Sequence, residues 1–175
     1  MVRLEALVPD SATGKTKELF NTIAGKFGGV SNMMRGMGNS PAFLEGFLNF
    51  FGSLSKGKLG AKTGTLLSLT IAEANACHYC LAAHTYIGAT FNKLDIDTIK
   101  LARRGASQDP RTDAILKFAL ALVNKGGRVS DQDVASIRAV GVTDEEITEI
   151  VGHVGLNILT NYFNNTAGTE IDIPA

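Results

Sequence analysis

The sequence predicts an all-α fold, and three observations support that prediction. Apolar residues recur at helical spacing along most of the chain, and patterns typical of helix starts precede several of these stretches. No stretch keeps the strict apolar–polar alternation of a half-buried strand. We find neither a strong internal repeat nor a low-complexity linker, so we expect residues 1–175 to form one helical domain.

The first third of the chain is expected to be an extended lead-in followed by helices. Residues 1–12 are predicted to be extended with a turn at Pro9, and a helix over 13–26 should end at Gly28-Gly29. Residues 32–38 suit a short helix or a loop. Ser40-Pro41 resembles an N-cap followed by proline at the first helical position, so another helix should begin there.

That helix carries a Phe-rich segment, residues 43–51, which is apolar on most sides. A segment of this kind is buried either by its own fold or by a neighbouring subunit. A substrate channel lined by aromatic rings is the alternative, and plain core or interface is the preferred interpretation.

The remaining helices are predicted from apolar stripes and capping signals. We expect an apolar helix over 61–75, a break at Asn75-Ala76, and a second helix that carries Cys80, His84 and Gly88. Further helices are expected over 95–104, from Asp109-Pro110 to Gly126, from Ser130, and from Thr143 to about Asn164. The helices that begin after Ser130 and Thr143 both have a capping-box pattern, with Asp133 and Glu146 three residues after the N-cap. The tail, Gly168 to Pro174, is expected to be extended.

Composition excludes several classes of function. The formal net charge is zero, so no basic surface is expected to attract nucleic acid. No run of about 20 apolar residues is present and the N-terminus lacks the apolar core of a signal peptide, so we expect neither a membrane span nor export. Charged residues make up 19% of the chain, below the usual ~25%, which favours an oligomer.

Both cysteines and two of the three histidines lie in one stretch, Glu73 to His84. Glu73, Cys77, Cys80 and His84 follow one another at steps of four, three and four residues. A Cys-x-x-Cys pair at the first turn of a helix can form a disulfide, and the helix dipole favours the thiolate. Because disulfide frameworks are rare in the cytoplasm, where we expect this chain, the pair is predicted to be redox-active.

The histidine and the glutamate suggest a route for the thiol proton. His84 lies one turn after Cys80 and could accept that proton, while Glu73 could orient the imidazole. On a straight helix Glu73 and His84 would be roughly 16 Å apart, so they can meet only if the helix breaks or through water. Thiolate attack on a peroxide would give a sulfenic acid, which the second cysteine converts to a disulfide that an external dithiol reduces.

Three other interpretations of this stretch are open. The cysteines could be inert core residues, or Cys77, Cys80 and His84 could bind zinc with Glu73 or His153 as the fourth ligand. The pair could also be a thiol–disulfide carrier with little peroxidase activity. Redox chemistry is the preferred interpretation, and it requires no cofactor and no metal. His153 is more simply explained as a surface residue, and Tyr79 as a packing residue.

The segment Asn75-Ala76-Cys77-His78-Tyr79-Cys80-Leu81-Ala82-Ala83-His84-Thr85 resembles the core of the alkylhydroperoxidase AhpD-like, carboxymuconolactone decarboxylase-like family. The end of the chain, from Asn161 through Asp172, resembles the tail of its peroxidase-related branch. The resemblance implies helices packed around the helix with the cysteines, homo-oligomers such as trimers or hexamers, and thiol-dependent reduction of peroxides.

The resemblance also implies a role for each site residue. Cys80 would be the cysteine that becomes a sulfenic acid, Cys77 its partner and His84 the proton relay. The founding peroxidases have a relay glutamate twelve residues before the first motif cysteine, a position that Thr65 occupies here, and Glu73 is the available substitute. The true decarboxylases of the family lack the cysteine pair, which argues against lactone decarboxylation.

Overall fold

A computed structural model describes residues 1–173 of the protein, and within that range all regular structure is helical. This confirms the predicted all-α class. The elements in order are η1 (Pro9–Ser11), α1 (Gly14–Phe27), α2 (Asn32–Met37), α3 (Pro41–Leu54), α4 (Gly60–Ala74), α5 (His78–Thr90), α6 (Ile96–Arg103), α7 (Pro110–Lys125), α8 (Asp131–Ala139) and α9 (Asp144–Ala167).

The predicted capping signals begin or end the helices where the sequence places them. The Ser40 hydroxyl accepts a hydrogen bond from the Phe43 N–H, and both capping boxes, at Ser130 and Thr143, are complete. α1 ends at Gly28, whose φ of 80° is easily adopted only by glycine. The last helix continues three residues beyond the predicted end at Asn164, to Ala167.

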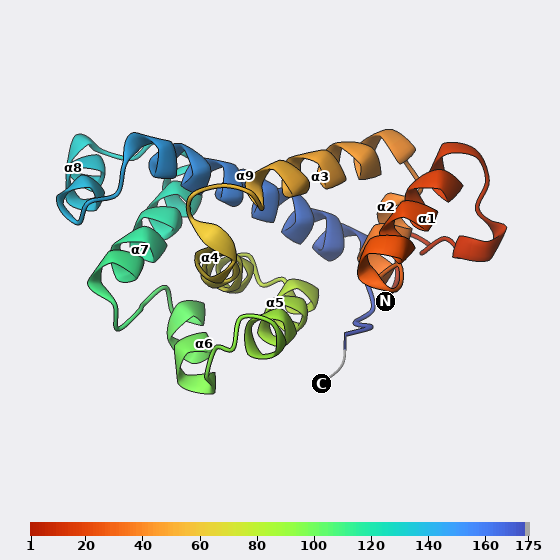
Figure 1. The fold of residues 1–175 in the computed structure, drawn as a ribbon, viewed down its shortest axis with the longest axis horizontal. Coiled ribbons are helices and arrows are strands. Elements are labelled where there is room, and N and C mark those ends of the chain that lie inside the picture. The colour runs from red at the N-terminus through yellow and green to blue at the C-terminus, as the bar shows by residue number, and fades with distance from the viewer. Residues whose placement is uncertain (174–175) are drawn as a thin grey trace.

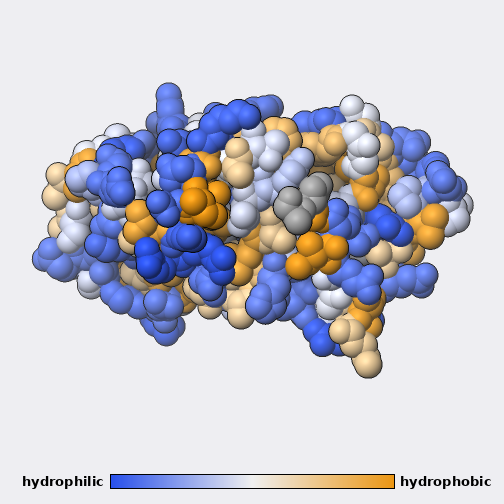
Figure 2. Space-filling model, turned by 90° about the horizontal axis from the view of Figure 1, so that it is seen from below, coloured by the Kyte–Doolittle hydropathy of each residue, from blue (hydrophilic) through white to orange (hydrophobic). Residues whose placement is uncertain are grey.

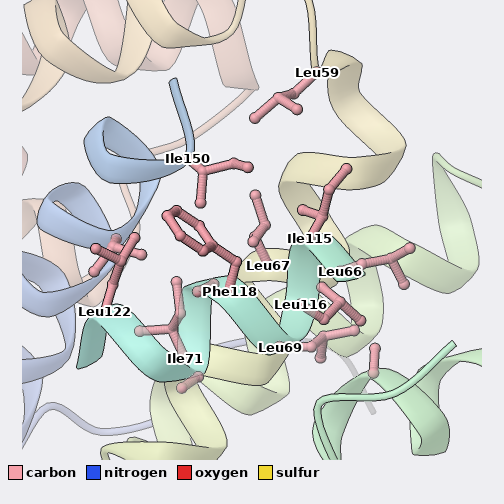
Figure 3. Close-up of a cluster of buried hydrophobic side chains, with 14 of the residues drawn as sticks. Leu59, Leu66, Leu67, Leu69, Ile71, Ile115, Leu116, Phe118, Leu122 and Ile150 are labelled. Atoms are coloured by element: carbon pink, nitrogen blue, oxygen red, sulfur yellow. The ribbon is translucent and has the colours of Figure 1, made fainter. Parts of the chain in front are cut away.

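The helix at the centre of the main core is α4, not the helix with the cysteines. α4 contacts α5, α6, α7 and α9, and Figure 1 shows it end-on between them. The predicted packing around the cysteine-bearing helix is therefore wrong, because α4 is the more deeply buried element: Leu67, Leu69 and Ile71 are fully buried in it. In Figure 3, Leu67 lies near Phe118 of α7 and Ile150 of α9, which closes the main core.

A second hydrophobic cluster joins α1, α2 and α3 to the middle of α9. Phe20, Ile23 and Met37 are buried in it, and Met37 fills space in this cluster. A Cβ added at Gly152 would lie 3.0 Å from Leu54, which explains how α3 and α9 approach closely there.

The Phe-rich segment divides between core and surface. Leu44 and Phe47 are buried, whereas Phe43, Phe50 and Phe51 are 36–42% exposed. The chain's own fold therefore buries only one side of α3, and burial of the other side by a neighbouring subunit stays a prediction.

The two ends of the chain are tied to the helices near the site. The Arg3 side chain donates hydrogen bonds to the carbonyls of Asn165 and Thr166 at the end of α9. In the C-terminal segment Asp172 accepts a hydrogen bond of 2.7 Å from the Asn32 N–H at the start of α2. Pro174, which the sequence places in the extended tail, lies outside the described residues.

Candidate redox site

The turn between α4 and α5 brings the motif to the start of a helix. The helix breaks where expected: α4 ends at Ala74, and the N–H groups of Ala76 and Cys77 bond back to the carbonyls of Glu73 and Ala72. This is the Schellman arrangement, which places Ala76 at the position that glycine usually occupies. Ala76 has φ of 48°, a left-handed conformation that is strained for alanine.

The two cysteines lie at the first turn of α5 and are joined by a disulfide. Cys77 is the N-cap, its Sγ accepts a hydrogen bond from the Cys80 N–H, and the two Cα atoms are 5.3 Å apart. At this position the positive end of the helix dipole favours negative charge on sulfur. The pair is thus close enough for reversible disulfide chemistry and has an electrostatic reason to form a thiolate.

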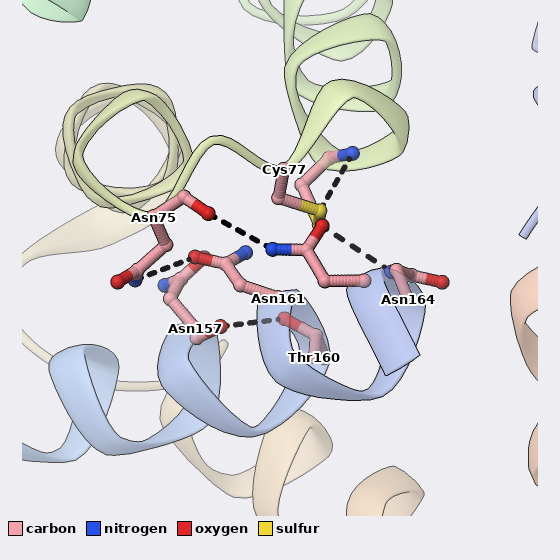
Figure 4. Close-up of a disulfide and its surroundings, with 8 residues drawn as sticks. Asn75, Cys77, Asn157, Thr160, Asn161 and Asn164 are labelled. Carbon is pink, nitrogen blue, oxygen red and sulfur yellow. Dashed lines mark hydrogen bonds between the residues drawn. A yellow bond between two sulfur atoms is a disulfide. The ribbon is translucent and has the colours of Figure 1, made fainter. Parts of the chain in front are cut away.

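Both sulfur-bearing residues are buried under α9. Cys77 is 0% and Cys80 3% exposed. The side-chain Nδ2 of Asn164 lies 3.4 Å from Cys80 Sγ and donates a hydrogen bond to it. Figure 4 shows Asn161 and Asn164 rising from α9 toward the disulfide and the turn before it.

The asparagines of α9 form a polar surface inside an otherwise apolar interface. Asn161 accepts a hydrogen bond from the Asn75 side chain, and Asn165 donates one to the Asn75 carbonyl (Figure 4). Asn161 and Asn164 are 0% and 3% exposed, yet Nδ2 of the first and Oδ1 of the second have no partner among the described residues. Buried polar atoms are rarely left this way, so the site retains unused hydrogen-bonding capacity beside the disulfide.

The sequence motifs assign no role at the site to these asparagines. Asn157, Asn161 and Asn164 recur at helical spacing within the apolar stripe of the last helix. Polar residues at the helical positions of an apolar stripe could have indicated a buried polar face, because such residues are buried and need hydrogen-bond partners.

His84 lies one turn after Cys80 on α5, and its Nδ1 atom is buried. That atom has no hydrogen-bond partner among the described residues, and burial lowers the pKa of His84 to about 4. The imidazole is therefore neutral at physiological pH, which is the form that can accept a proton from a thiol.

Glu73 forms no hydrogen bond with the Nδ1 atom of His84. Its Oε2 atom lies 2.6 Å from Nε of Arg103 on α6, and both side chains are about two-fifths exposed. Glu73, which the sequence suggests could orient His84, is thus engaged by an arginine on the neighbouring helix and forms no direct hydrogen bond with His84 Nδ1.

Three other residues from the sequence analysis have defined surroundings. Thr65 is buried and accepts a hydrogen bond of 2.7 Å from Asn92, so the position of the missing glutamate faces the end of α5. Tyr79 is buried as a packing residue, and its hydroxyl also bonds to Asp172. His153, expected at the surface, is half-buried against Gly64 of α4, and burial lowers its pKa.

Other features of the described residues bear on the open alternatives. No group of three or more His, Cys, Asp or Glu side chains in residues 1–173 is arranged to hold a metal ion. None of the described helices combines the length and the apolar character that a membrane span requires. A hollow of about 530 Å³ lies between the N-terminal segment, α2 and the tail, and its lining residues do not include the cysteines.

The fold and the site define a class: a helical protein with a buried thiol–disulfide pair at the start of a helix. Residues 41–121, which include Cys77, Cys80 and His84, match the model of the carboxymuconolactone decarboxylase family. The resemblance predicted from the motif is confirmed: residues 41–121 match the family model, and the fold of the chain is similar to that of an AhpD-core structure.

Solved structures share this fold over nearly the whole chain. An AhpD-core, peroxidase-related protein from Ralstonia eutropha JMP134 is 23% identical, with 98% of this chain and 92% of that one covered and a TM-score of 0.87. A peroxidase-related protein from Silicibacter sp. TM1040 is 21% identical, with coverage of 97% and 91% and a TM-score of 0.84. The debrominase Bmp8, as a cysteine-to-alanine variant in complex with 2,3,4-tribromopyrrole, is 18% identical, with coverage of 98% and 93% and a TM-score of 0.78. No curated protein sequence matches the chain.

Proposed function

We propose that the protein is a thiol-dependent peroxidase that reduces organic hydroperoxides or hydrogen peroxide and is regenerated by an external dithiol. The observation that carries the proposal is the Cys77–Cys80 disulfide at the N-terminus of α5. A reversible pair at a helix N-terminus supplies both the nucleophile and the group that resolves its oxidised form.

The proposed cycle has three balanced steps. The Cys80 thiolate attacks one peroxide oxygen, the O–O bond breaks, and the alkoxide takes a proton and leaves as an alcohol, with Cys80 as sulfenic acid. The Cys77 thiol then attacks that sulfur, which forms the disulfide and releases water. Finally an external dithiol reduces the disulfide by exchange and becomes a disulfide itself.

Neutral His84 supports this cycle as the proton relay. It can accept the Cys80 proton when the thiolate forms and return it to the departing alkoxide. Glu73 is engaged by Arg103, so in this proposal the histidine acts without the orienting carboxylate that the sequence suggests.

The decisive experiment is stopped-flow oxidation of the reduced protein by a panel of hydroperoxides, with mass spectrometry of both cysteines. Cys80→Ser should abolish peroxide consumption, and Cys77→Ser should leave a sulfenic acid on Cys80. The Cys77→Ser variant is well matched, because serine is itself a favourable N-cap for α5. Consumption of peroxide by the double-serine protein at the wild-type rate would eliminate the mechanism.

The same experiment separates two other activities. Rapid turnover with dithiols and no peroxide rate would favour a thiol–disulfide carrier. A brominated pyrrole belongs in the substrate panel, since one structural neighbour is named a debrominase.

We further propose that the protein acts in the cytoplasm as a homo-oligomer, a trimer or hexamer. Exposed Phe43, Phe50 and Phe51 on α3 and Val151 on α9 support an interface between copies there. On the face seen in Figure 2, below α5 and α6, the apolar residues instead form separate groups among hydrophilic ones. Analytical ultracentrifugation of wild type and Phe50→Lys tests the interface, and a wild-type monomer would contradict it.

A further inference from the structure

The side chain of Asn164, on α9, forms a hydrogen bond with the sulfur atom of Cys80. Its Nδ2 donates to Cys80 Sγ across 3.4 Å, and the residue is 3% exposed. Its Oδ1 is buried and has no partner among the described residues. Among the described residues, the side-chain amide of Asn164 therefore forms its hydrogen bond with the Cys80 sulfur.

A buried thiolate needs hydrogen-bond donors, because burial alone disfavours the charged form. A disulfide sulfur is only a weak acceptor, whereas a thiolate is a strong one. The hydrogen bond that Asn164 already donates to Cys80 in the oxidised protein should therefore become stronger when the sulfur becomes a thiolate. The amide also suits the protonated state, since Oδ1 can accept the bond that an S–H group donates.

The backbone around Asn164 holds this group in place. The Asn164 carbonyl accepts hydrogen bonds from the N–H groups of Gly168 and Thr169, which close the last turn of α9. One turn earlier, Asn161 bonds to Asn75 in the turn that precedes Cys77. The amide is thus presented to α5 by a helix that is fixed on both sides of the contact.

We propose that Asn164 is a catalytic residue whose side-chain N–H stabilises the Cys80 thiolate, the nucleophile of the proposed peroxidase. The inference rests on the proposed function for its biological meaning, but its physical content is the ionisation of one thiol. It assigns α9 a chemical role at the site, in addition to its role in the core.

The test measures that ionisation without any peroxide. In a Cys77→Ser background, thiolate absorbance is followed against pH for the protein with Asn164 intact and for Asn164→Leu. Loss of a hydrogen bond to a charged group should raise the Cys80 pKa by about one unit, which means about tenfold less thiolate at neutral pH. Asn161→Leu is the matched control: it removes an equally buried amide of the same helix that bonds to Asn75 instead, and should leave the pKa within about 0.3 unit.

The neighbouring titratable groups are common to all these variants. They are His84, one turn along α5, and Tyr79, whose hydroxyl is bonded to Asp172 of the tail. A pKa shift confined to Asn164→Leu therefore reports on the amide. Equal pKa values for the Asn164→Leu and Asn161→Leu proteins would overturn the proposal.

A measurement on the protein with Asn164 intact covers the case in which Asn164→Leu fails to fold. In the ¹⁵N-labelled Cys77→Ser protein, the side-chain NH₂ resonances of Asn164 should shift with pH at the midpoint of Cys80 ionisation. A resonance that does not respond at that midpoint would exclude the contact. If the pKa shift is found but peroxide is not consumed, the role of Asn164 stands and only the peroxidase assignment fails.

Discussion

The Tyr79 hydroxyl donates a hydrogen bond of 2.9 Å to Oδ1 of Asp172, although the two residues are 93 positions apart in the chain. The other carboxylate oxygen of Asp172 accepts from the Asn32 N–H at 2.7 Å. One carboxylate therefore joins Tyr79, one of the two residues between the cysteines, to the C-terminal segment and the start of α2. The conformation of the motif is consequently coupled to the tail.

Tyr79→Phe should loosen this tail. The variant keeps the buried ring but loses a hydrogen bond to a charged group, which should cost about 1–2 kcal/mol of unfolding free energy. Urea unfolding measures the loss, and limited proteolysis should cut the C-terminal segment faster. Tyr162→Phe is the control, because Tyr162 is 59% exposed and should change the midpoint little. Equal cleavage rates in both variants would contradict a role for Asp172 in holding the tail.

The hydroxyl of Tyr79 should lose its proton only at a higher pH than an ordinary tyrosine. Burial, assisted by the negative charge of Asp172, raises the pKa of Tyr79 to about 12. Since the unfolded chain loses this proton near pH 10, the contribution of Tyr79 to stability is complete below pH 10 and is lost between pH 10 and 12. Absorbance at alkaline pH should show this late step in wild type and not in Tyr79→Phe.

Ala76→Gly should stabilise the protein. Ala76 is exposed and has φ of 48°, so glycine relieves backbone strain without removing a packed side chain. After the entropy cost of glycine in the unfolded chain, a net gain of roughly 0.5–1 kcal/mol is expected in urea unfolding. Ala74→Gly, two residues earlier in helical conformation, should instead cost about 1 kcal/mol. Destabilisation by both variants would contradict the Schellman assignment.

His84 should make the protein sensitive to mild acid. Its pKa is about 4 in the folded chain and about 6.5 when unfolded, so the unfolded state binds the extra proton as pH falls below 6.5. Stability is therefore lost between pH 6.5 and 4, by up to about 2 kcal/mol at pH 5. Urea midpoints at pH 7 and pH 5 should differ less in His84→Leu than in wild type. An identical pH dependence would show that the imidazole is not held neutral.

Glu73→Gln should have little effect on peroxide turnover. The carboxylate is paired with Arg103 at the surface, and such exposed pairs contribute about 0–1 kcal/mol to stability. Arg103→Gln breaks the same pair from the other side and is the matched control. A large loss of rate in Glu73→Gln with none in Arg103→Gln would restore the orienting role suggested by the sequence.

Local signals account for what the sequence predicted well. The capping box at Thr143, the N-cap at Ser40 and the break at Asn75-Ala76 depend on residues within one turn, and all three occur where expected. The ion pair of Asp113 and Lys117, one turn apart on α7, is another contact of this local kind. The periodicity of α4 predicted a helix but not its central position, which depends on how four other helices pack against it.

The contacts that define the site are long-range, and the sequence pattern could not specify them. Nothing local indicates that Asn164 lies over Cys80, or that Arg103 of α6 engages Glu73. These pairings depend on the angles at which α6 and α9 cross the motif. The asparagine spacing predicted at most a buried polar face, whose partner only the tertiary arrangement identifies.

The burial of both sulfur atoms sets a kinetic limit on regeneration of the protein. A soluble dithiol must wait until the first turn of α5 separates locally from α9 before it can attack. At low dithiol concentration the rate of disulfide reduction should be proportional to that concentration. At high concentration the rate should reach a plateau equal to the rate of local opening. A physiological reductant that docks on the chain and promotes this opening would not be subject to that ceiling.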